Sequence, residues 1–191
     1  MRALLALLLT LAAWPASAQD PAPGQLLVRF ETSLGAFTVA LDTERAPLSA
    51  ASVARYAAEG HYTGTIFHRV VAGFVVQGGG YTVDGTEKPV RERVPNESGN
   101  GLTNRRGTIA LARHAEPHSA AAQFYVNLAD NINLDPRPDR WGYAVIGRVV
   151  DGMDVVDRIA GVPTGARGPF PQEAPQKPVV ITRAEVLGGK Q

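Results

Sequence analysis

The chain has 191 residues, of which 45% are hydrophobic and 19% are charged, values typical of one globular domain with its own core. The formal net charge of +1 disfavours nucleic acids and anionic membrane surfaces as partners, because both need concentrated positive charge. The absence of cysteine excludes disulfides, thiol catalysis and cysteine-based metal sites.

The first eighteen residues have the three parts of a secretory signal peptide. Arg2 supplies a basic start, residues 3–14 are apolar, and Ala16-Ser17-Ala18 supplies the small residues that signal peptidase reads. The apolar run is shorter than the about 20 residues of a transmembrane helix. We therefore expect cleavage before Gln19, export, and no membrane attachment afterwards. The alternative interpretation is a buried N-terminal helix.

Residues 19–25 are rich in Pro and Gly and predict a flexible leader, followed by a single domain over residues 26–191. Helices are expected from Pro47 to a stop at Gly60, and over Met153–Ala160, because apolar residues recur on one face of each. Alternating apolar and polar residues predict strands over residues 26–33, 36–41, 65–70, 74–78, 108–112, 123–128, 144–150 and 178–187.

Strands that follow one another without intervening helices do not suit a doubly wound sheet. The pattern predicts a mainly β fold: a closed eight-stranded antiparallel β-barrel capped by two α-helices, which hides the strand edges. Long loops are uncommon in compact domains unless they serve function, so we expect the site where such loops meet. They cover residues 81–106, 113–122, 131–141 and 163–177.

The segment Phe67–Gly79 combines a permanent cation with apolar and amide side chains. Arg69 stays charged at any relevant pH and presents several donors in a rigid fork. Phe74 and Val75 offer apolar surface beside it, and Gln77 points from the same strand face as Val75. A second predicted strand places Gln123 and Tyr125 together on one face.

These motifs resemble the cyclophilin family of peptidyl-prolyl cis–trans isomerases. The similarity extends from about Leu26 to Leu187, and the loop from Asp130 to Tyr143 resembles the exported bacterial branch, which implies a periplasmic location. The segments that carry it, in the family order, are Phe67-His68-Arg69, Gly73–Gly79, Thr108–Arg113, Ser119–Val126 and Gly142–Val149. The resemblance also implies an eight-stranded barrel with two helices.

The resemblance implies an isomerase, or rotamase, that accelerates rotation about Xaa-Pro bonds and assists the folding of exported proteins. Rotation has a barrier of roughly 18–20 kcal/mol because amide resonance must be broken, but it requires no nucleophile, metal or cofactor. The twisted amide is stabilised by a fixed cation near the prolyl nitrogen and a dry cup for the ring. One charge-assisted hydrogen bond contributes only about 1.5–3 kcal/mol, so the cation needs the cup.

Carried over residue by residue, the resemblance assigns a role to each candidate site residue. Arg69 matches the catalytic arginine. The expected substrate-binding residues are a proline cup of Phe74, Val75, Tyr125 and Leu134; Gln77 and Gln123, which orient the arginine and the substrate; an edge of Ala112, Arg113 and His114; Tyr143, where many eukaryotic members have His; and Asn133.

Asn133 is the main departure from the family pattern. Many eukaryotic members have a Trp there that lines the pocket and hydrogen-bonds cyclosporin, so we expect weak cyclosporin binding with activity retained. Trp141 lies eight residues further along the same loop and is a candidate to refill the gap, a question that the sequence leaves open.

His68 is expected to be a structural, hydrogen-bonded residue turned away from Arg69, because neighbours on a strand alternate faces. His114 and His118 have a spacing that suits a metal but lack carboxylate support, so no metal is expected.

A non-catalytic proline-peptide binding module or chaperone is the alternative function, and a barrel with an internal apolar ligand is a more distant one. A monomer is the default expectation.

Overall fold

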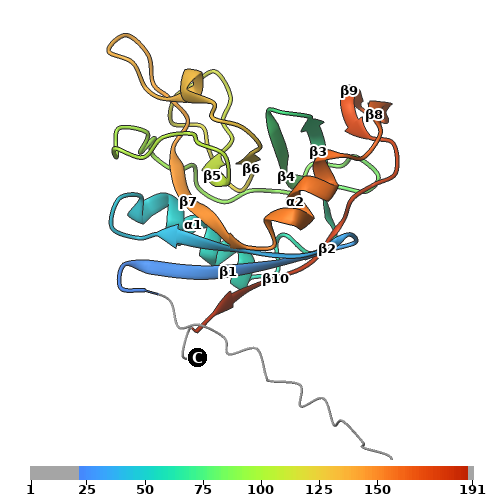
Figure 1. Ribbon diagram of the computed structural model, residues 1–191, viewed down its shortest axis with the longest axis horizontal. Helices are drawn as coiled ribbons and strands as arrows, with labels where there is room; N and C mark the ends of the chain where they lie inside the picture. Colours follow the sequence, from blue (N-terminus) through green and yellow to red (C-terminus); the bar gives the residue numbers. More distant parts are fainter. Residues whose placement is uncertain (1–21, 189–191) are drawn as a thin grey trace, which may run out of the picture.

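The computed structural model describes residues 22–188 as a curled sheet with two helices and a small separate hairpin (Figure 1). The elements in chain order are β1 (Gln25–Thr32), β2 (Gly35–Asp42), α1 (Pro47–Ala58), β3 (Thr65–Val71), β4 (Val75–Thr82), β5 (Thr108–Leu111), β6 (Phe124–Asn127), the 3-10 helix η1 (Ile132–Leu134), β7 (Val145–Asp151), α2 (Met153–Ala160), β8 (Thr164–Arg167), β9 (Phe170–Pro175) and β10 (Ile181–Leu187).

Eight strands form one antiparallel sheet in the order β10-β1-β2-β7-β5-β6-β4-β3. The edge strands β3 and β10 meet only through the isolated bridge between Ile66 and Val180 and neighbouring backbone hydrogen bonds, such as that from Phe67 N–H to the Val179 carbonyl at 3.0 Å. The prediction of a closed barrel is therefore wrong: the sheet is open and curled. Pro178 precedes this contact and has no N–H to donate, and beyond Phe67 strand β3 lies against β9 instead.

The hairpin of β8 and β9 was predicted to be part of a loop over residues 163–177. Its pairing runs from Thr164 opposite Pro175 to Arg167 opposite Phe170, with an irregularity between. Gly and Pro are frequent in this segment, and both residues weaken strand propensity, which explains why its sequence indicates a loop. The 3-10 helix η1 likewise lies inside a predicted loop.

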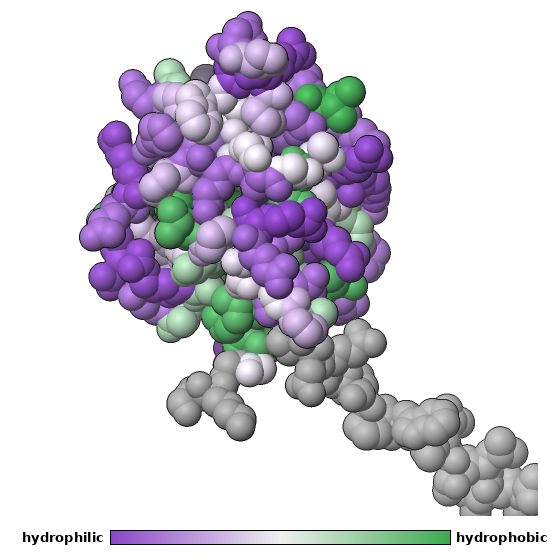
Figure 2. Space-filling model, turned by 90° about the vertical axis from the view of Figure 1, so that its left-hand side faces the viewer, coloured by the Kyte–Doolittle hydropathy of each residue, from purple (hydrophilic) through white to green (hydrophobic). Residues whose placement is uncertain are grey.

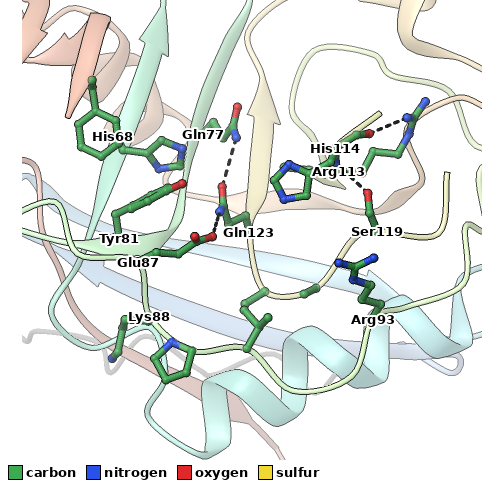
Figure 3. Close-up of a pocket in the computed structure, with 16 residues that line it drawn as sticks. His68, Gln77, Tyr81, Glu87, Lys88, Arg93, Arg113, His114, Ser119 and Gln123 are labelled. Atoms are coloured by element: carbon green, nitrogen blue, oxygen red, sulfur yellow. Dashed lines mark hydrogen bonds between the residues drawn. The ribbon is translucent and has the colours of Figure 1, made fainter. Parts of the chain in front are cut away.

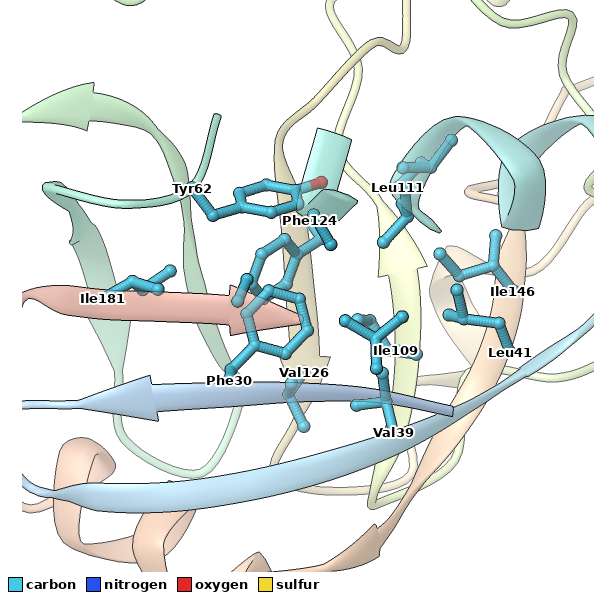
Figure 4. Close-up of a cluster of buried hydrophobic side chains, with 14 of the residues drawn as sticks. Phe30, Val39, Leu41, Tyr62, Ile109, Leu111, Phe124, Val126, Ile146 and Ile181 are labelled. Carbon is cyan, nitrogen blue, oxygen red and sulfur yellow. The ribbon is translucent and has the colours of Figure 1, made fainter. Parts of the chain in front are cut away.

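The concave side of the sheet is filled by a packed core (Figure 4). The rings of Phe30 and Phe37 stack at 5.2 Å, and Phe124 packs 4.9 Å from Phe30. Tyr62 is fully buried, and its hydroxyl donates to the Ala122 carbonyl at 2.9 Å. A filled interior of this kind argues against an apolar ligand inside the sheet.

The two helices pack against different strands of the curled sheet. Helix α1 begins at Pro47 as predicted and contacts β10, β1, β2 and β7. Its first-turn N–H groups at Leu48 and Ser49 donate to the carboxylate of Glu97, at 3.1 and 2.8 Å. Helix α2 contacts β2, β3 and β4 and buries Val155 as well as the predicted Val156 and Ile159, whereas Met153 is only partly buried.

The predicted signal peptide, residues 1–18, lies outside the described residues, as does the first part of the predicted leader. The end of that leader is ordered, because Gln25 already begins β1 and its N–H donates to the Ala22 carbonyl at 3.0 Å. Within residues 22–188, no helix combines the length and the apolar character needed to cross a membrane.

Candidate active site

The site lies on the outer face of the strands whose inner face forms the core. Val75, Ala110, Tyr125 and Val145 come from β4, β5, β6 and β7 and form a buried cluster separate from the main core, which we call the outer cluster. Successive residues of a strand point to opposite faces, so the chain neighbours of these four residues, except Phe74, belong to the main core. Those neighbours are Val76, Ile109, Leu111, Phe124, Val126, Ala144 and Ile146.

The outer cluster and the loops around it enclose a cavity of about 240 Å³, which we call the cup. The side chains of Val75 and Ala112 are short and those of Phe74, Tyr125 and Tyr143 are long, so a hollow remains between them. Every residue that lines the cup is among the predicted site residues: Arg69, Phe74, Val75, Gln77, Ala112, Arg113, Tyr125, Leu134 and Tyr143.

The other three predicted site residues do not line the cup. His114 and Gln123 line a larger adjoining pocket of about 540 Å³, which shares Gln77, Ala112 and Arg113 with the cup (Figure 3). Asn133 lines neither cavity. It is exposed in η1, where its carbonyl accepts a hydrogen bond from Arg140 Nη2 at 2.6 Å.

Arg69 stands at the edge of the cup, with 38% of its side chain exposed. Its Nε donates to Glu173 Oε2 at 2.7 Å, and its guanidinium carbon lies 5.7 Å from the centroid of the Phe74 ring. The prediction that Gln77 orients the arginine does not describe the observed contact, because the hydrogen-bond partner of Arg69 is Glu173. Sequence reasoning missed Glu173. This acid lies 104 positions from Arg69 in a predicted loop, and no sequence pattern indicates that the two residues are in contact.

The absence of a side chain at Gly80 allows Gln123 to approach β4. A Cβ on Gly80 would meet the Gln123 side chain at 2.4 Å, and Gly79 has a φ of +87° that favours glycine. Gln123 accepts a hydrogen bond from Gln77 Nε2 and donates to Glu87 Oε1, each at 3.4 Å (Figure 3). Both hydrogen bonds are long, so the side chains of Gln77, Gln123 and Glu87 can rearrange when a peptide binds.

Arg113 builds the wall between the cup and the adjoining pocket. Its guanidinium donates to the carbonyls of His114, Trp141 and Gly142 at 2.9, 2.9 and 3.2 Å, and it lies 4.6 Å from the Tyr143 ring centroid. These contacts tie the loop after β5 to the loop before β7. Arg113 thereby shapes both cavities, and its donors are occupied by backbone carbonyls.

A buried polar network supports the floor of the cup from behind. The Tyr125 hydroxyl donates to Asn104 Oδ1 at 2.7 Å, and Asn104 Nδ2 donates to Asp135 Oδ1 at 2.8 Å. Asn131 Nδ2 donates to the Phe74 carbonyl at 2.9 Å and so fixes the backbone of Phe74 in the wall of the cup. Burial raises the pKa of the Tyr125 hydroxyl well above its usual value, which keeps this group a hydrogen-bond donor.

His68 lines the adjoining pocket, whereas Arg69 lines the cup (Figure 3). The prediction that it is hydrogen-bonded is wrong for Nδ1, which is buried without a partner. Burial, followed by the charge of Arg69, lowers the pKa of His68 to about 4. Its ring packs instead against Tyr81 and Phe170, with centroids 4.7 and 5.5 Å away.

His118 and Trp141 make structural contacts with each other and with the neighbouring loop. His118 Nδ1 accepts a hydrogen bond from the Asn96 N–H at 3.0 Å, and its ring lies 5.2 Å from that of Trp141. Trp141 is 47% exposed and does not line the cup, so it does not refill the position of Asn133. Within residues 22–188, no three His, Cys, Asp or Glu side chains form a cluster suited to a metal.

The geometry thus joins an apolar hollow to the cationic side chain of Arg69 at its edge. The cup is walled by Phe74, Val75, Tyr125 and Leu134, and Arg69 holds the edge. Such an arrangement can desolvate an apolar ring and stabilise a developing lone pair beside it.

The sequence profile described as "Cyclophilin type peptidyl-prolyl cis-trans isomerase/CLD" matches residues 27–186. The chain belongs to this cyclophilin family. It is accordingly a peptidyl-prolyl cis–trans isomerase, as its relatives also indicate. It is 48% identical over 160 residues to peptidyl-prolyl cis-trans isomerase A of Dickeya dadantii, covering 84% of each chain. It is 44% identical to peptidyl-prolyl cis-trans isomerase B of Escherichia coli, covering 84% of this chain and 99% of that protein.

Solved cyclophilin structures share the fold. A crystal structure of a cyclophilin type isomerase from Cryptosporidium parvum has a TM-score of 0.71 at 21% sequence identity, covering 87% of this chain and 99% of the other. A second structure of that protein, obtained in the presence of the dipeptide Ala-Pro, has a TM-score of 0.69 and covers 85% of this chain.

Proposed function

We propose that this isomerase holds the proline ring of an Xaa-Pro segment in the cup, with Arg69 as the catalytic residue. The observation that carries the proposal is the position of Arg69 at the edge of an apolar cavity with only its Nε engaged: within residues 22–188, no hydrogen bond uses Nη1 or Nη2. Those two groups therefore remain available to donate to the substrate.

The reaction proceeds in the proposed site by stabilisation of a twisted amide. Rotation localises the lone pair on the prolyl nitrogen, and a guanidinium donor placed there interacts more strongly with the transition state than with either planar isomer. Phe74, Val75, Tyr125 and Leu134 exclude water from the ring, which strengthens that interaction. The segment before the proline extends across Gln77 and Ala112 into the adjoining pocket, since these residues line both cavities.

The proposed setting is the folding of exported proteins, with the mature enzyme in a periplasm. The support is the signal-like pattern of residues 1–18, with its apolar run before Ala16-Ser17-Ala18. Unfolded chains contain cis and trans Xaa-Pro bonds that exchange in about 10–100 s, so exported proteins benefit from an isomerase. The natural substrates are exposed Xaa-Pro segments of such unfolded or partly folded chains.

We also propose a monomer that binds cyclosporin weakly. The face in Figure 2 is largely hydrophilic with small separate apolar groups, and the exposed large apolar side chains within residues 22–188 are spread over several elements. Cyclosporin should bind weakly because neither Asn133 nor Trp141 presents a side chain in the lining of the cup.

The test is exchange spectroscopy on a short Xaa-Pro peptide with the wild type and Arg69→Ala. The matched control is Arg183→Ala, which removes another arginine in an ion pair, with Nη2 2.6 Å from Glu185 Oε2 on β10. We expect catalysed exchange to collapse only for Arg69→Ala. Equal acceleration by Arg69→Ala and the wild type would contradict the assignment of Arg69.

A further inference from the structure

We propose that Glu173 is a positioning residue that sets the orientation of the Arg69 guanidinium from outside the cup. The inference rests on the proposed catalytic role of Arg69. Its basis is the contact of Arg69 Nε with Glu173 Oε2 at 2.7 Å, which joins β3 to the hairpin of β8 and β9.

Glu173 has an unusual backbone conformation. It is the one residue other than glycine within residues 22–188 with a positive φ, 61°. The left-handed region is unfavourable for a glutamate, and such residues persist where the surrounding structure imposes them, often at functional sites. The strain therefore indicates that the hairpin is built to present this side chain.

A bulge in the hairpin explains how the strained conformation arises. Gly165 pairs with Ala174, and Arg167 pairs with Phe170. Between these pairs β8 contributes Ala166 alone, whereas β9 contributes residues 171–173. Extra residues in one strand change the direction in which a side chain points, and here they turn Glu173 toward β3.

The hairpin is fixed to the sheet beside the adjoining pocket, which Phe170, Tyr81 and His68 line, so the carboxylate is held by a rigid support. Phe170 packs 5.1 Å from the Tyr81 ring and 5.5 Å from the His68 ring. Arg167 Nη2 also donates to the Val83 carbonyl at 2.6 Å. These contacts anchor both ends of the turn between β8 and β9 to the β3–β4 region.

The consequence for Arg69 follows from the shape of its guanidinium. The group is planar, so an acceptor at Nε fixes the plane and thereby the directions of Nη1 and Nη2. Preorganised donors avoid reorganisation during the reaction, and a misplacement of about 1 Å can lower a rate 100-fold. Glu173 thus supplies an orientation that neither Phe74 nor the long Gln77–Gln123 contact enforces.

The experiment measures kcat and KM for an Ala-Pro peptide in Glu173→Ala, Glu173→Gln, Arg69→Ala and the double variant Arg69→Ala/Glu173→Ala. Alanine and glutamine both keep a Cβ, so the backbone strain at position 173 is retained in each. The matched control is Glu185→Ala, because Glu185 also pairs with an arginine and its side chain is 31% exposed against 32% for Glu173.

We expect Glu173→Ala to lower kcat about 10-fold with KM little changed, because an oriented donor acts in the transition state. Glu173→Gln should lose less, about 3-fold, since its amide oxygen still accepts from Nε. In the double variant Glu173→Ala should add nothing to Arg69→Ala, and Glu185→Ala should leave kcat unchanged. The NMR signal of Arg69 Nε–Hε should broaden or shift in Glu173→Ala but not in Glu185→Ala.

The outcomes separate this inference from the proposed function. Wild-type or increased kcat in Glu173→Ala, with Arg69→Ala inactive, would overturn the role of Glu173 and leave that of Arg69 intact. A loss of thermal stability in Glu173→Ala without a loss of kcat would overturn it equally, since that is a structural role. Full activity of Arg69→Ala would remove both proposals together.

Discussion

Strands β4, β5, β6 and β7 carry two different surfaces, and comparing them shows how stability and catalysis are divided. On the inner face, Ile109, Leu111, Phe124 and Ile146 are large, fully buried side chains of the main core. On the outer face, small side chains such as Ala110 lie among aromatic ones, and a cavity of about 240 Å³ remains. One face stabilises the fold, and the other leaves space for a substrate.

The separation of core residues and cup residues between the two faces follows from strand geometry. Side chains alternate, so a single residue step changes a core position into a cup position. Leu111 belongs to the main core and its neighbour Ala112 lines the cup. Substitutions on the two faces should therefore affect different measurements.

The largest expected effect is on the inner face. Leu111→Ala should lower the free energy of unfolding by about 2–5 kcal/mol, because it leaves a cavity among rigid neighbours at a position that is 2% exposed. Chemical denaturation measures this loss. Activity per folded molecule should stay near that of the wild type, and a specific loss of kcat at full folding would show that the two faces are coupled.

The next effect is a pH dependence that arises at His68. Its pKa is lowered to about 4 by burial, so below pH 6.5 the unfolded chain binds a proton that the folded chain does not. Stability should therefore fall as pH falls, by about 3 kcal/mol between pH 7 and pH 4 relative to His68→Phe. Parallel denaturation curves for the two proteins at these pH values test the prediction, and identical pH dependence would contradict it.

A smaller effect is expected at Tyr125, which belongs to the outer face. Tyr125→Phe removes the hydroxyl that donates to Asn104 Oδ1 at 2.7 Å, so stability should fall by about 1 kcal/mol. Asn104 Oδ1 still accepts from Asn127 Nδ2 at 3.2 Å, and the aromatic wall of the cup is kept. Isomerase activity should be retained, and a large loss in a peptide exchange assay would assign the hydroxyl a role in catalysis.

Alternation along a strand is local information, so the sequence predicted most of the strands, whereas the lining of the cup was assigned mainly by the resemblance to the cyclophilin family. Arg69, Phe74, Val75 and Gln77 lie within one short segment, and the structure brings them together. The closed barrel was wrong because closure depends on whether the edge strands β3 and β10 pair along their length, a contact between distant segments that alternation does not report.

The other missed features depend on distant contacts as well. Glu173 reaches Arg69 only because a bulge and a left-handed residue turn it there, in a segment whose Gly and Pro content indicated a loop. Asn133 was placed in the site by resemblance, but η1 leaves it exposed. Neither the bulge nor the turn of η1 has a periodic pattern that a sequence displays.

The most direct test of the account is to fill the cup from one side. Ala112→Leu enlarges a half-buried side chain that lines the cup without touching the main core, so the thermal midpoint should change little. Exchange spectroscopy on an Ala-Pro peptide should show kcat/KM lowered about 10-fold or more, since the ring loses its space. Unchanged acceleration by a folded Ala112→Leu protein would contradict the account and place isomerisation outside the cup.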